Sequence, residues 1–218
     1  MASESGAVET GDRGRPCVVD AVAGLQEGAD AGEHGFGAGP VGRLLVAVAP
    51  PDDAGGQLDA EFRTELVAEL ARRYLRAVRA HAKGSGTPRV WQVLLTRWEG
   101  GSGDPARTAL AGAHALVSFD LPPAVVSVCT LLGRGPGPAE QAVVQALTAQ
   151  IARLANEAAD AHSRDDASGL ALLASRSETW RQAQHLWTMR GRPLEAEKER
   201  AALDWRAALV ARALLGSG

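Results

Sequence analysis

Apolar side chains recur at helical spacing along most of the chain. Between Leu58 and His81 they are three or four positions apart, so they share one face of a helix; they are Phe62, Leu66, Leu70, Tyr74 and Ala77. The same spacing predicts helices over residues 90–98, 105–117, 120–132, 138–161, 169–189 and 194–215. Residues 18–25 are expected to form a short helix. Residues 41–48 could form a short helix or a buried strand, because periodicity does not separate the two in so short a run.

Glycine and proline clusters separate these segments. The breaks fall at residues 84–88, 100–105, 133–138 and 191–193, with a polar turn at 162–168. Asp104 followed by Pro105 is a favourable N-cap and first-turn pair. Short connections, with no run of alternating strands and no internal repeat, predict an all-α fold, a single-domain multi-helix bundle of about six to eight helices. Residues 1–15 are predicted to be a disordered N-terminal tail and residues 16–218 a single helical domain.

Charge and composition narrow the functional classes. Apolar residues make up 45% of the chain, and the formal net charge of −3 is too small to indicate DNA or membrane binding by itself. Nearly all bases are arginine, which together with abundant Ala and Gly is typical of a GC-rich bacterial genome. Four of them crowd one helix and are interpreted as a solvated face, not a nucleic-acid surface: Arg72, Arg73, Arg76 and Arg79. Glu69 and Arg73 are expected to form an exposed i,i+4 pair.

No motif for a cofactor, a metal or secretion is present in the sequence. It has no glycine-rich loop between a strand and a helix, no His-Glu-x-x-His or Cys-x-x-Cys spacing, and no Gly-x-Ser-x-Gly elbow. The N-terminus does not resemble a secretion signal, and no apolar stretch approaches membrane-spanning length. Cys129 lies in an apolar run and is expected to be a buried small hydrophobe, with no motivated disulfide to Cys17. We therefore predict a cytoplasmic protein that uses no cofactor and no metal and binds neither nucleic acid nor membranes.

The segment over residues 112–122 is the strongest candidate for chemistry. It places His114, Ser118 and Asp120 at a predicted junction between two helices, within apolar sequence. His114 and Ser118 are four residues apart and share a helical face. A histidine beside a carboxylate can act as a general acid–base, because its pKa lies near neutrality. The structural alternative is that Asp120 caps the following helix and that His114 is a satisfied core or edge residue.

Arg176 and four tryptophans complete the set of candidate residues. Arg176 falls on the apolar stripe of its helix, one turn before Trp180, so its guanidinium needs a carboxylate such as Asp120 or an aromatic face. This arginine is interpreted either as a buried clamp or as a ligand-binding residue. Four indole side chains could form a core or line an apolar cavity for a hydrophobic ligand: Trp91, Trp98, Trp180 and Trp187.

Several of these segments resemble one bacterial helical family. The stretch Glu-Leu-Ala-Arg-Arg-Tyr-Leu-Arg-Ala over residues 69–77, Pro-Arg-Val-Trp at 88–91, the segment around Asp120, and Arg-Ser-Glu-Thr-Trp at 176–180 are similar to the family catalogued as domain of unknown function 5995. The resemblance covers roughly residues 40–190. That family reads Asn-Ala-His-Ile-Asn-x-Asp-Leu-Pro at the central motif. Here the Asp, Leu and Pro are kept, whereas His114, Leu116 and Ser118 stand at the family's Asn, His and Asn, so a role for the family's histidine does not carry over.

Three functions follow as hypotheses. The first is a cofactor-independent cyclase or other tailoring enzyme that folds a hydrophobic natural-product intermediate in an apolar bundle pocket. In it, His114, Asp120 and Arg176 would assist proton transfer or polarisation, and Ser118 and the four tryptophans would bind the substrate. The second is a non-catalytic binding or assembly module, including self-association, which predicts a filled core and an apolar surface patch. The third is a hydrolase that needs a water near Asp120.

Overall fold

The chain folds as an all-α bundle, as the periodicity predicts. The computed structural model describes residues 39–49, 60–101, 104–160 and 167–216, and no strand occurs among them. The elements are α2 (Pro40–Val48), α3 (Ala60–Ala82), α4 (Arg89–Glu99), α5 (Pro105–Ala115), the π-helical η1 (Leu116–Asp120), α6 (Leu121–Leu131), α7 (Pro138–Asp160), α8 (Ala167–Thr188) and α9 (Pro193–Leu215). Because α5, η1 and α6 follow one another without a break, the described residues form seven helical rods, within the predicted six to eight.

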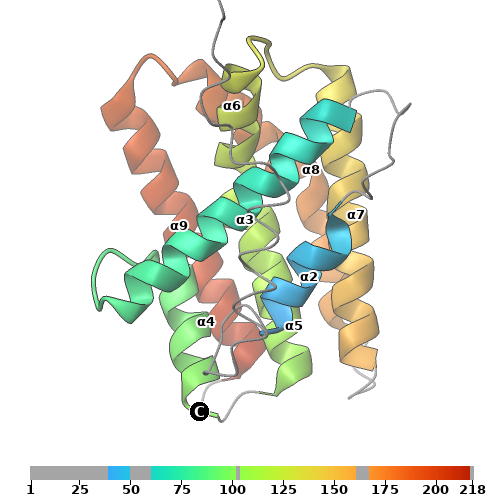
Figure 1. Cartoon of the computed structure of the whole chain (residues 1–218), viewed down its shortest axis with the longest axis vertical. Helices are drawn as coiled ribbons and strands as arrows, with labels where there is room; N and C mark the ends of the chain where they lie inside the picture. The colour runs from blue at the N-terminus through green and yellow to red at the C-terminus, as the bar shows by residue number, and fades with distance from the viewer. Residues whose placement is uncertain (1–38, 50–59, 102–103, 161–166, 217–218) are drawn as a thin grey trace, which may run out of the picture.

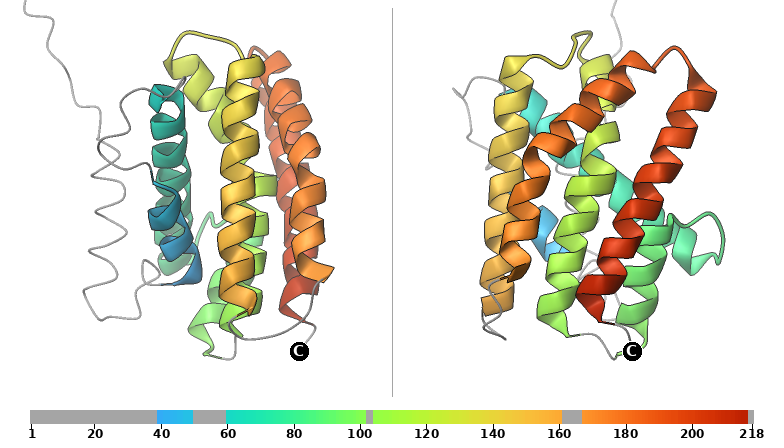
Figure 2. Two further views of the ribbon diagram at one scale, coloured as in Figure 1. Left: turned by 90° about the vertical axis from the view of Figure 1, so that its right-hand side faces the viewer. Right: turned by 180° about the vertical axis from the view of Figure 1, so that it is seen from behind.

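The continuous rod α5–η1–α6 lies at the centre of the bundle. Figure 2 shows α2 and α3 on one side of it and α8 and α9 on the other, and α3 crosses the bundle diagonally in Figure 1. The rod packs against α2, α3, α4, α7, α8 and α9, so it is the element that every neighbour shares. Side chains of the rod therefore meet residues that lie far apart in the sequence.

One large apolar core takes residues from every helix, and a second, smaller cluster lies at the connection between α8 and α9. The large core includes the predicted stripe of α3, from Phe62 to Ala77, and the buried Cys129, as the apolar pattern predicts. Burial raises the pKa of the Cys129 thiol to about 11, so this side chain stays a neutral hydrophobe. Helices α2 and α5 pack closely where they cross, because a Cβ on Gly112 would overlap the Cγ2 methyl of Val41.

The helical rod does not break at Asp120, contrary to the expectation of a helix–turn–helix junction. Pro122 and Pro123 lack amide hydrogens, yet they continue the helix because the backbone widens into a π-turn just before them. The amide of Leu121 donates to the carbonyl of Leu116, five residues back. The Val117 carbonyl is left without a backbone donor, because the Leu121 amide bonds to Leu116 and Pro122 has no amide hydrogen. It accepts a hydrogen bond of 3.2 Å from the buried Thr179 hydroxyl of α8. The π-turn is thus held in place by a side chain from another helix.

Most predicted boundaries agree with the structure. Residues 41–48 form helix α2 and not a strand, and the Asp104 carboxylate caps α5 by accepting from the Ala106 amide at 2.9 Å. The glycine-rich segments after α3, α4 and α6 end those helices. The proposed tail over residues 1–15, the short helix over 18–25 and Cys17 lie outside the described residues.

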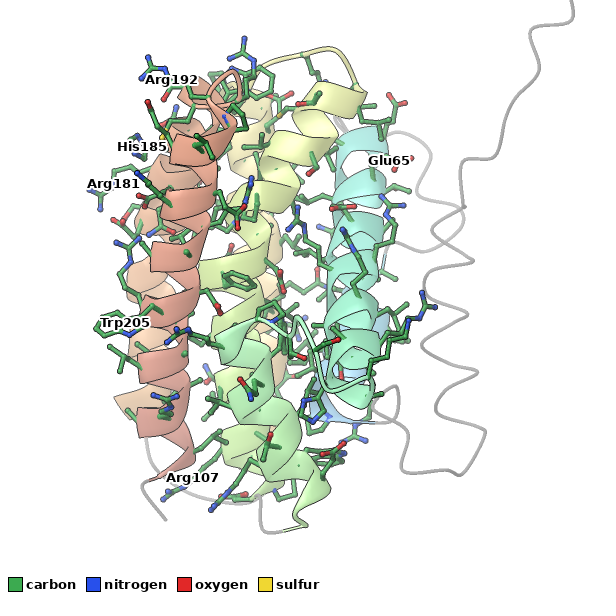
Figure 3. All side chains as sticks on the ribbon, turned by 90° about the vertical axis from the view of Figure 1, so that its left-hand side faces the viewer. Glu65, Arg107, Arg181, His185, Arg192 and Trp205 are labelled. Atoms are coloured by element: carbon green, nitrogen blue, oxygen red, sulfur yellow. The ribbon has the colours of Figure 1, made fainter. Side chains whose placement is uncertain are left out.

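Helix α9 exposes Trp205, which projects away from the bundle (Figure 3).

By length and composition the rod Pro105–Leu131 could cross a membrane, whereas the sequence analysis predicts no apolar stretch of that length. Of the most apolar 18 residues of this rod, however, 67% are buried inside the bundle, and the core helix of a soluble protein has the same length and composition.

Candidate functional site

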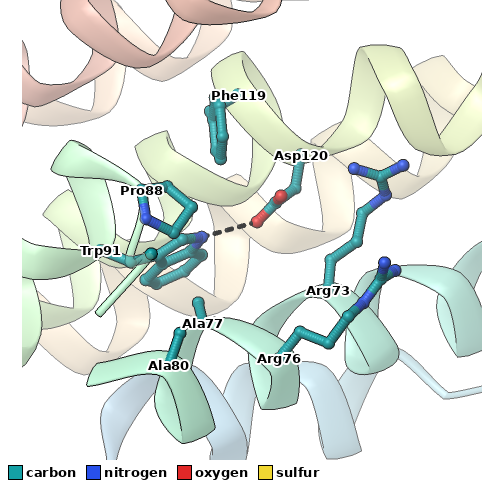
Figure 4. A pocket seen from close by; sticks show the side chains of 9 residues that line it. Arg73, Arg76, Ala77, Ala80, Pro88, Trp91, Phe119 and Asp120 are labelled. Atoms are coloured by element: carbon teal, nitrogen blue, oxygen red, sulfur yellow. Dashed lines mark hydrogen bonds between the residues drawn. The ribbon is translucent and has the colours of Figure 1, made fainter. Parts of the chain in front are cut away.

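A pocket of about 360 Å³ lies between α3, the start of α4 and η1 (Figure 4). It opens to solvent, and its walls are mostly apolar. Its lining consists of Arg73, Arg76, Ala77, Ala80, Gly86, Pro88, Trp91, Phe119 and Asp120. Two arginines and one carboxyl are therefore the charged groups of this lining.

Asp120 supplies the carboxyl at the inner end of the pocket. Its side chain is only 2% exposed, and Oδ2 accepts a hydrogen bond of 2.9 Å from the indole N–H of Trp91 (Figure 4). Among the described residues its other oxygen, Oδ1, accepts no hydrogen bond. Asp120 does not cap α6, since no amide donates to its side chain. The π-turn instead directs this carboxyl toward α3 and α4.

Burial raises the pKa of Asp120 to about 7. The positive charge of Arg73, the hydrogen bond from Trp91 and the charge of Arg76 favour the ionised form and oppose this rise, whereas Glu69 adds to it. Removal from water is therefore the dominant effect. A carboxyl with such a pKa is present in both protonation states near neutral pH, which is the property that general acid–base chemistry requires.

Arg73 and Arg76 reach the pocket from successive turns of α3. Oε1 of Glu69 lies 2.9 Å from Nε of Arg73 and 3.4 Å from Nη2 of Arg76, and Arg72 pairs with the other oxygen of Glu69 at 3.0 Å. Glu69 is buried, so the expected exposed pair of Glu69 and Arg73 is instead part of a half-buried cluster. The interpretation of all four arginines as a solvated face is accordingly wrong for Arg73, whereas Arg76 and Arg79 are exposed.

Two neighbouring helices hold Trp91 in position. The Asp204 carboxylate of α9 accepts hydrogen bonds of 2.9 Å from the amides of both Arg89 and Val90, and so caps the start of α4. Tyr74 of α3 packs edge-on against the indole, with ring centroids 5.1 Å apart. The indole N–H is thus directed to Asp120 by contacts from α3 and α9.

His114 and Ser118 form a separate pair on the central rod. Oγ of Ser118 lies 3.3 Å from Nδ1 of His114, as the four-residue spacing predicts. Burial lowers the pKa of His114 to about 4, so the ring is neutral near pH 7, and its Nε2 is buried with no hydrogen-bond partner among the described residues. Neither residue lines the pocket at Asp120.

The tryptophans do not share one cavity. Trp91 lines the pocket at Asp120, and together with Trp98 it borders a void of only about 20 Å³ on the far side of the indole. Trp180 is buried in the core, and Trp187 lies at its edge, where the guanidinium of Arg190 stacks 4.2 Å from its ring. Arg176 belongs to α8, but its side chain lies outside the described residues.

Sequence reasoning missed Arg73 and Arg76 as pocket residues. A usable signal was present: small residues Ala77 and Ala80 follow these arginines at helical spacing, which leaves open space beside the guanidinium groups. The pattern of α3 alone does not reveal which helix faces that space. Pro88 and Phe119 were missed for the same reason.

The chain belongs to a family of unknown function, DUF5995, which it matches over residues 45–217. This confirms the resemblance and extends it almost to the C-terminus. No curated protein and no solved structure matches the chain. Leu116, at the position of the family's histidine, is buried in the core. Within the described ranges, no group of three or more His, Cys, Asp or Glu residues is placed to hold a metal ion.

Proposed function

We propose that the protein is a cofactor-independent enzyme in which Asp120 acts as the proton donor, with a cyclase or another tailoring reaction as the reaction class. The observation that carries this proposal is a single buried carboxyl at the inner end of an open pocket, with one oxygen bonded to Trp91 and the other left for a ligand. Buried carboxyls without a role are costly, and those in clefts are frequent catalytic groups.

The surroundings of Asp120 suit both states of such a donor. The protonated carboxyl can transfer its proton from Oδ1 to a basic or unsaturated atom of the substrate. The carboxylate that remains keeps the hydrogen bond from Trp91 at Oδ2 and the field of Arg73, both of which stabilise negative charge. Solvent at the open mouth returns the proton after product release. As the product forms, the protonated substrate releases a proton from another of its atoms to solvent, so the reaction is a net rearrangement in which the enzyme is unchanged.

The pocket walls favour a substrate with an apolar body. Trp91, Phe119 and Pro88 form flat apolar surfaces, and ligand pockets commonly have volumes of roughly 300–1,000 Å³. An apolar wall beside a protonating group holds a flexible substrate in a folded conformation. These features support cyclisation over hydrolysis, which needs an ordered water at the same carboxyl.

The test is untargeted turnover of a small-molecule extract. Purified protein and the Asp120→Asn variant are incubated with the extract in heavy water, and the products are separated by chromatography and mass spectrometry. We expect a compound that the unaltered protein converts and the variant does not, with solvent deuterium added at a carbon atom. Apart from the deuterium taken up from solvent, cyclisation conserves the mass or removes one water, whereas hydrolysis adds one water, so the mass of the product separates the two reactions.

A matched control uses His114. His114→Gln alters a buried polar group of the same rod that does not line the pocket, so we expect it to retain turnover. Equal conversion by the unaltered protein and Asp120→Asn would contradict the proposal. Loss of conversion in His114→Gln alone would assign the chemistry to the His114–Ser118 pair.

The outer face of α9 supports self-association as a second candidate function. Trp205 is 53% exposed and Leu209, one turn later, 43% exposed. Beside them lie the pairs Glu197–Arg200 and Glu199–Arg206, so the face offers both charge signs to a second copy of the same face. Light scattering after size exclusion should show a dimer that Trp205→Ser dissociates. Leu131→Ser, which removes an apolar side chain of similar exposure on α6, should leave the dimer intact, and a monomer for the unaltered chain would exclude this function.

A further inference from the structure

We infer that the pocket at Asp120 binds an organic anion, in which a carboxylate is held by Arg73 and Arg76 and an apolar body rests on Trp91, Pro88 and Phe119. This inference rests on the proposed function and specifies the substrate class of the same site. Its basis is the arrangement of charge and apolar surface along the pocket.

The two guanidinium groups have donors left for an anion. Nε of Arg73 lies 2.9 Å from Glu69 in an ion pair without a hydrogen bond, and Nη2 of Arg73 donates to the Ser127 hydroxyl at 3.3 Å. Arg76 donates from Nη2 to Glu69 and from Nε to the Arg72 carbonyl. Among the described residues, Nη1 of neither arginine donates to an acceptor. Glu69 therefore fixes both groups at the pocket without using all their donors, as a binding site for a carboxylate requires.

The charge of the lining is also positive in excess. Two arginines face one carboxyl, and protonation of Asp120 leaves both positive charges without a counter-charge in the lining. Glu69 lies behind the arginines and offsets part of this charge. An anionic substrate completes the balance, whereas a neutral one leaves the two arginines with Glu69 as their shared carboxylate.

Anion binding is coupled to the proton on Asp120. The groups that act on this carboxyl are Arg73, Arg76 and Glu69 of α3 and Trp91 of α4. A substrate carboxylate on the arginines cancels part of the field that favours ionised Asp120, and adds a like charge near it. Both effects raise the pKa of Asp120. The bound anion therefore keeps the proton donor protonated, and binding near pH 7 takes up a proton from solution.

The experiment is calorimetric titration with two probes of nearly the same shape, one charged and one neutral. The probes are a naphthalene carboxylate and the neutral naphthalene carboxamide with the same ring position. We expect the carboxylate to bind about ten-fold more tightly, because its charge-assisted hydrogen bonds to arginine outweigh the cost of its desolvation. Inorganic phosphate, which lacks an apolar body, should bind more weakly than the carboxylate.

Variants locate the site and separate the two proposals. Arg73→Gln and Arg76→Gln should bring the two naphthalene probes to within about two-fold of each other, whereas Arg79→Gln, on the same helix but exposed and outside the pocket, should change nothing. Titrations in buffers of different ionisation enthalpy should show proton uptake that Asp120→Asn abolishes.

Each outcome has one meaning. Equal affinity of the two probes for the unaltered protein would overturn the anion inference, even if Asp120-dependent turnover is found. Preferential carboxylate binding that survives both arginine substitutions would place the anion elsewhere and would also overturn it. Arginine-dependent binding in a protein without turnover would support the anion site and contradict only the proposed catalysis.

Discussion

The Trp91–Asp120 contact sets the protonation behaviour of the site. The indole N–H donates to Oδ2 and so stabilises the ionised carboxyl, in opposition to burial. Replacing Trp91 by Phe keeps an aromatic wall and removes only this donor. We expect the Trp91→Phe variant to raise the pKa of Asp120 by about one unit, because a hydrogen bond to the charged form has been lost.

Carbon-13 NMR of labelled aspartate measures this shift directly. Trp187→Phe is the matched control, since its indole lies at the edge of the core beside Arg190 and makes no contact with Asp120. It should leave the titration of Asp120 unchanged. An unchanged or lower pKa in Trp91→Phe would mean that the indole does not act on the carboxyl.

At the residue scale, the sequence supports some site assignments and not others. Asp120 is recognisable because an acid in strongly apolar sequence has few structural roles. Arg73 and Arg76 are not, since an arginine-rich helix is ordinarily a solvated one, and only the position of η1 and α4 opposite shows that two of these side chains face a pocket. The four tryptophans look equivalent along the chain, yet their distances from Asp120 are determined by the packing of different helices.

The π-turn in the central rod depends on a hydroxyl from α8. Thr179 donates to the Val117 carbonyl, which the wider helical register leaves without an amide partner. Thr179→Val keeps the shape and removes this donor. We expect a loss of about 1–3 kcal/mol in the free energy of unfolding, the typical cost of leaving a buried carbonyl unsatisfied.

Thr148→Val provides the comparison for urea unfolding of Thr179→Val. Thr148 is equally buried, but its hydroxyl bonds to the carbonyl four residues earlier within the uninterrupted helix α7, where that carbonyl also serves a backbone amide. Its substitution should cost clearly less. Equal losses in the two variants would argue that the Thr179 bond does not support the π-turn.

A second prediction at the scale of elements concerns the crossing of α2 and α5. A Cβ on Gly112 would overlap a methyl group of Val41, so Gly112→Ala forces the two helices apart. Overpacking costs about 1–3 kcal/mol, and the better helix propensity of alanine returns up to about 1 kcal/mol. We expect a net decrease in the free energy of unfolding.

Two further variants test the cause of that decrease by thermal or urea unfolding. Gly191→Ala, in a turn with open space around the Cα, should be nearly neutral. The double variant Gly112→Ala with Val41→Ala should show a favourable coupling energy, because truncating Val41 removes the clash. Purely additive effects would show that the crossing is not tight at this point.

At the scale of elements, helix boundaries follow from local sequence while continuity does not. Glycine and proline clusters correctly end α3, α4 and α6, because each acts through its own backbone. The Asp120-Leu-Pro-Pro segment has the composition of a helix start, yet it continues a rod because the backbone widens into a π-turn before the two prolines. Tertiary packing provides the Thr179 donor that local rules do not anticipate.

At the scale of the whole molecule, two buried titratable groups on one rod oppose each other. The native pKa of Asp120, about 7, lies above its ordinary 3.8, so the native state binds more protons than the unfolded state between these values. This carboxyl therefore makes stability fall as pH rises from about 4 to about 7. The native pKa of His114, about 4, lies below its ordinary 6.5, so the imidazole makes stability rise with pH over nearly the same interval.

Removing one group should therefore reveal the other. Relative to the unaltered protein, Asp120→Asn should gain stability progressively from about pH 4 to about pH 7, because the cost of ionising a buried carboxyl is gone. His114→Gln should gain stability in the opposite direction, as pH falls from about 6.5 to about 4. Urea unfolding at intervals across this range measures both differences, and the shared background of other titrating groups cancels in each. Difference curves that are flat with pH would show that neither group changes its protonation on folding, and a flat curve for Asp120→Asn alone would remove the physical basis for Asp120 as a proton donor near neutrality.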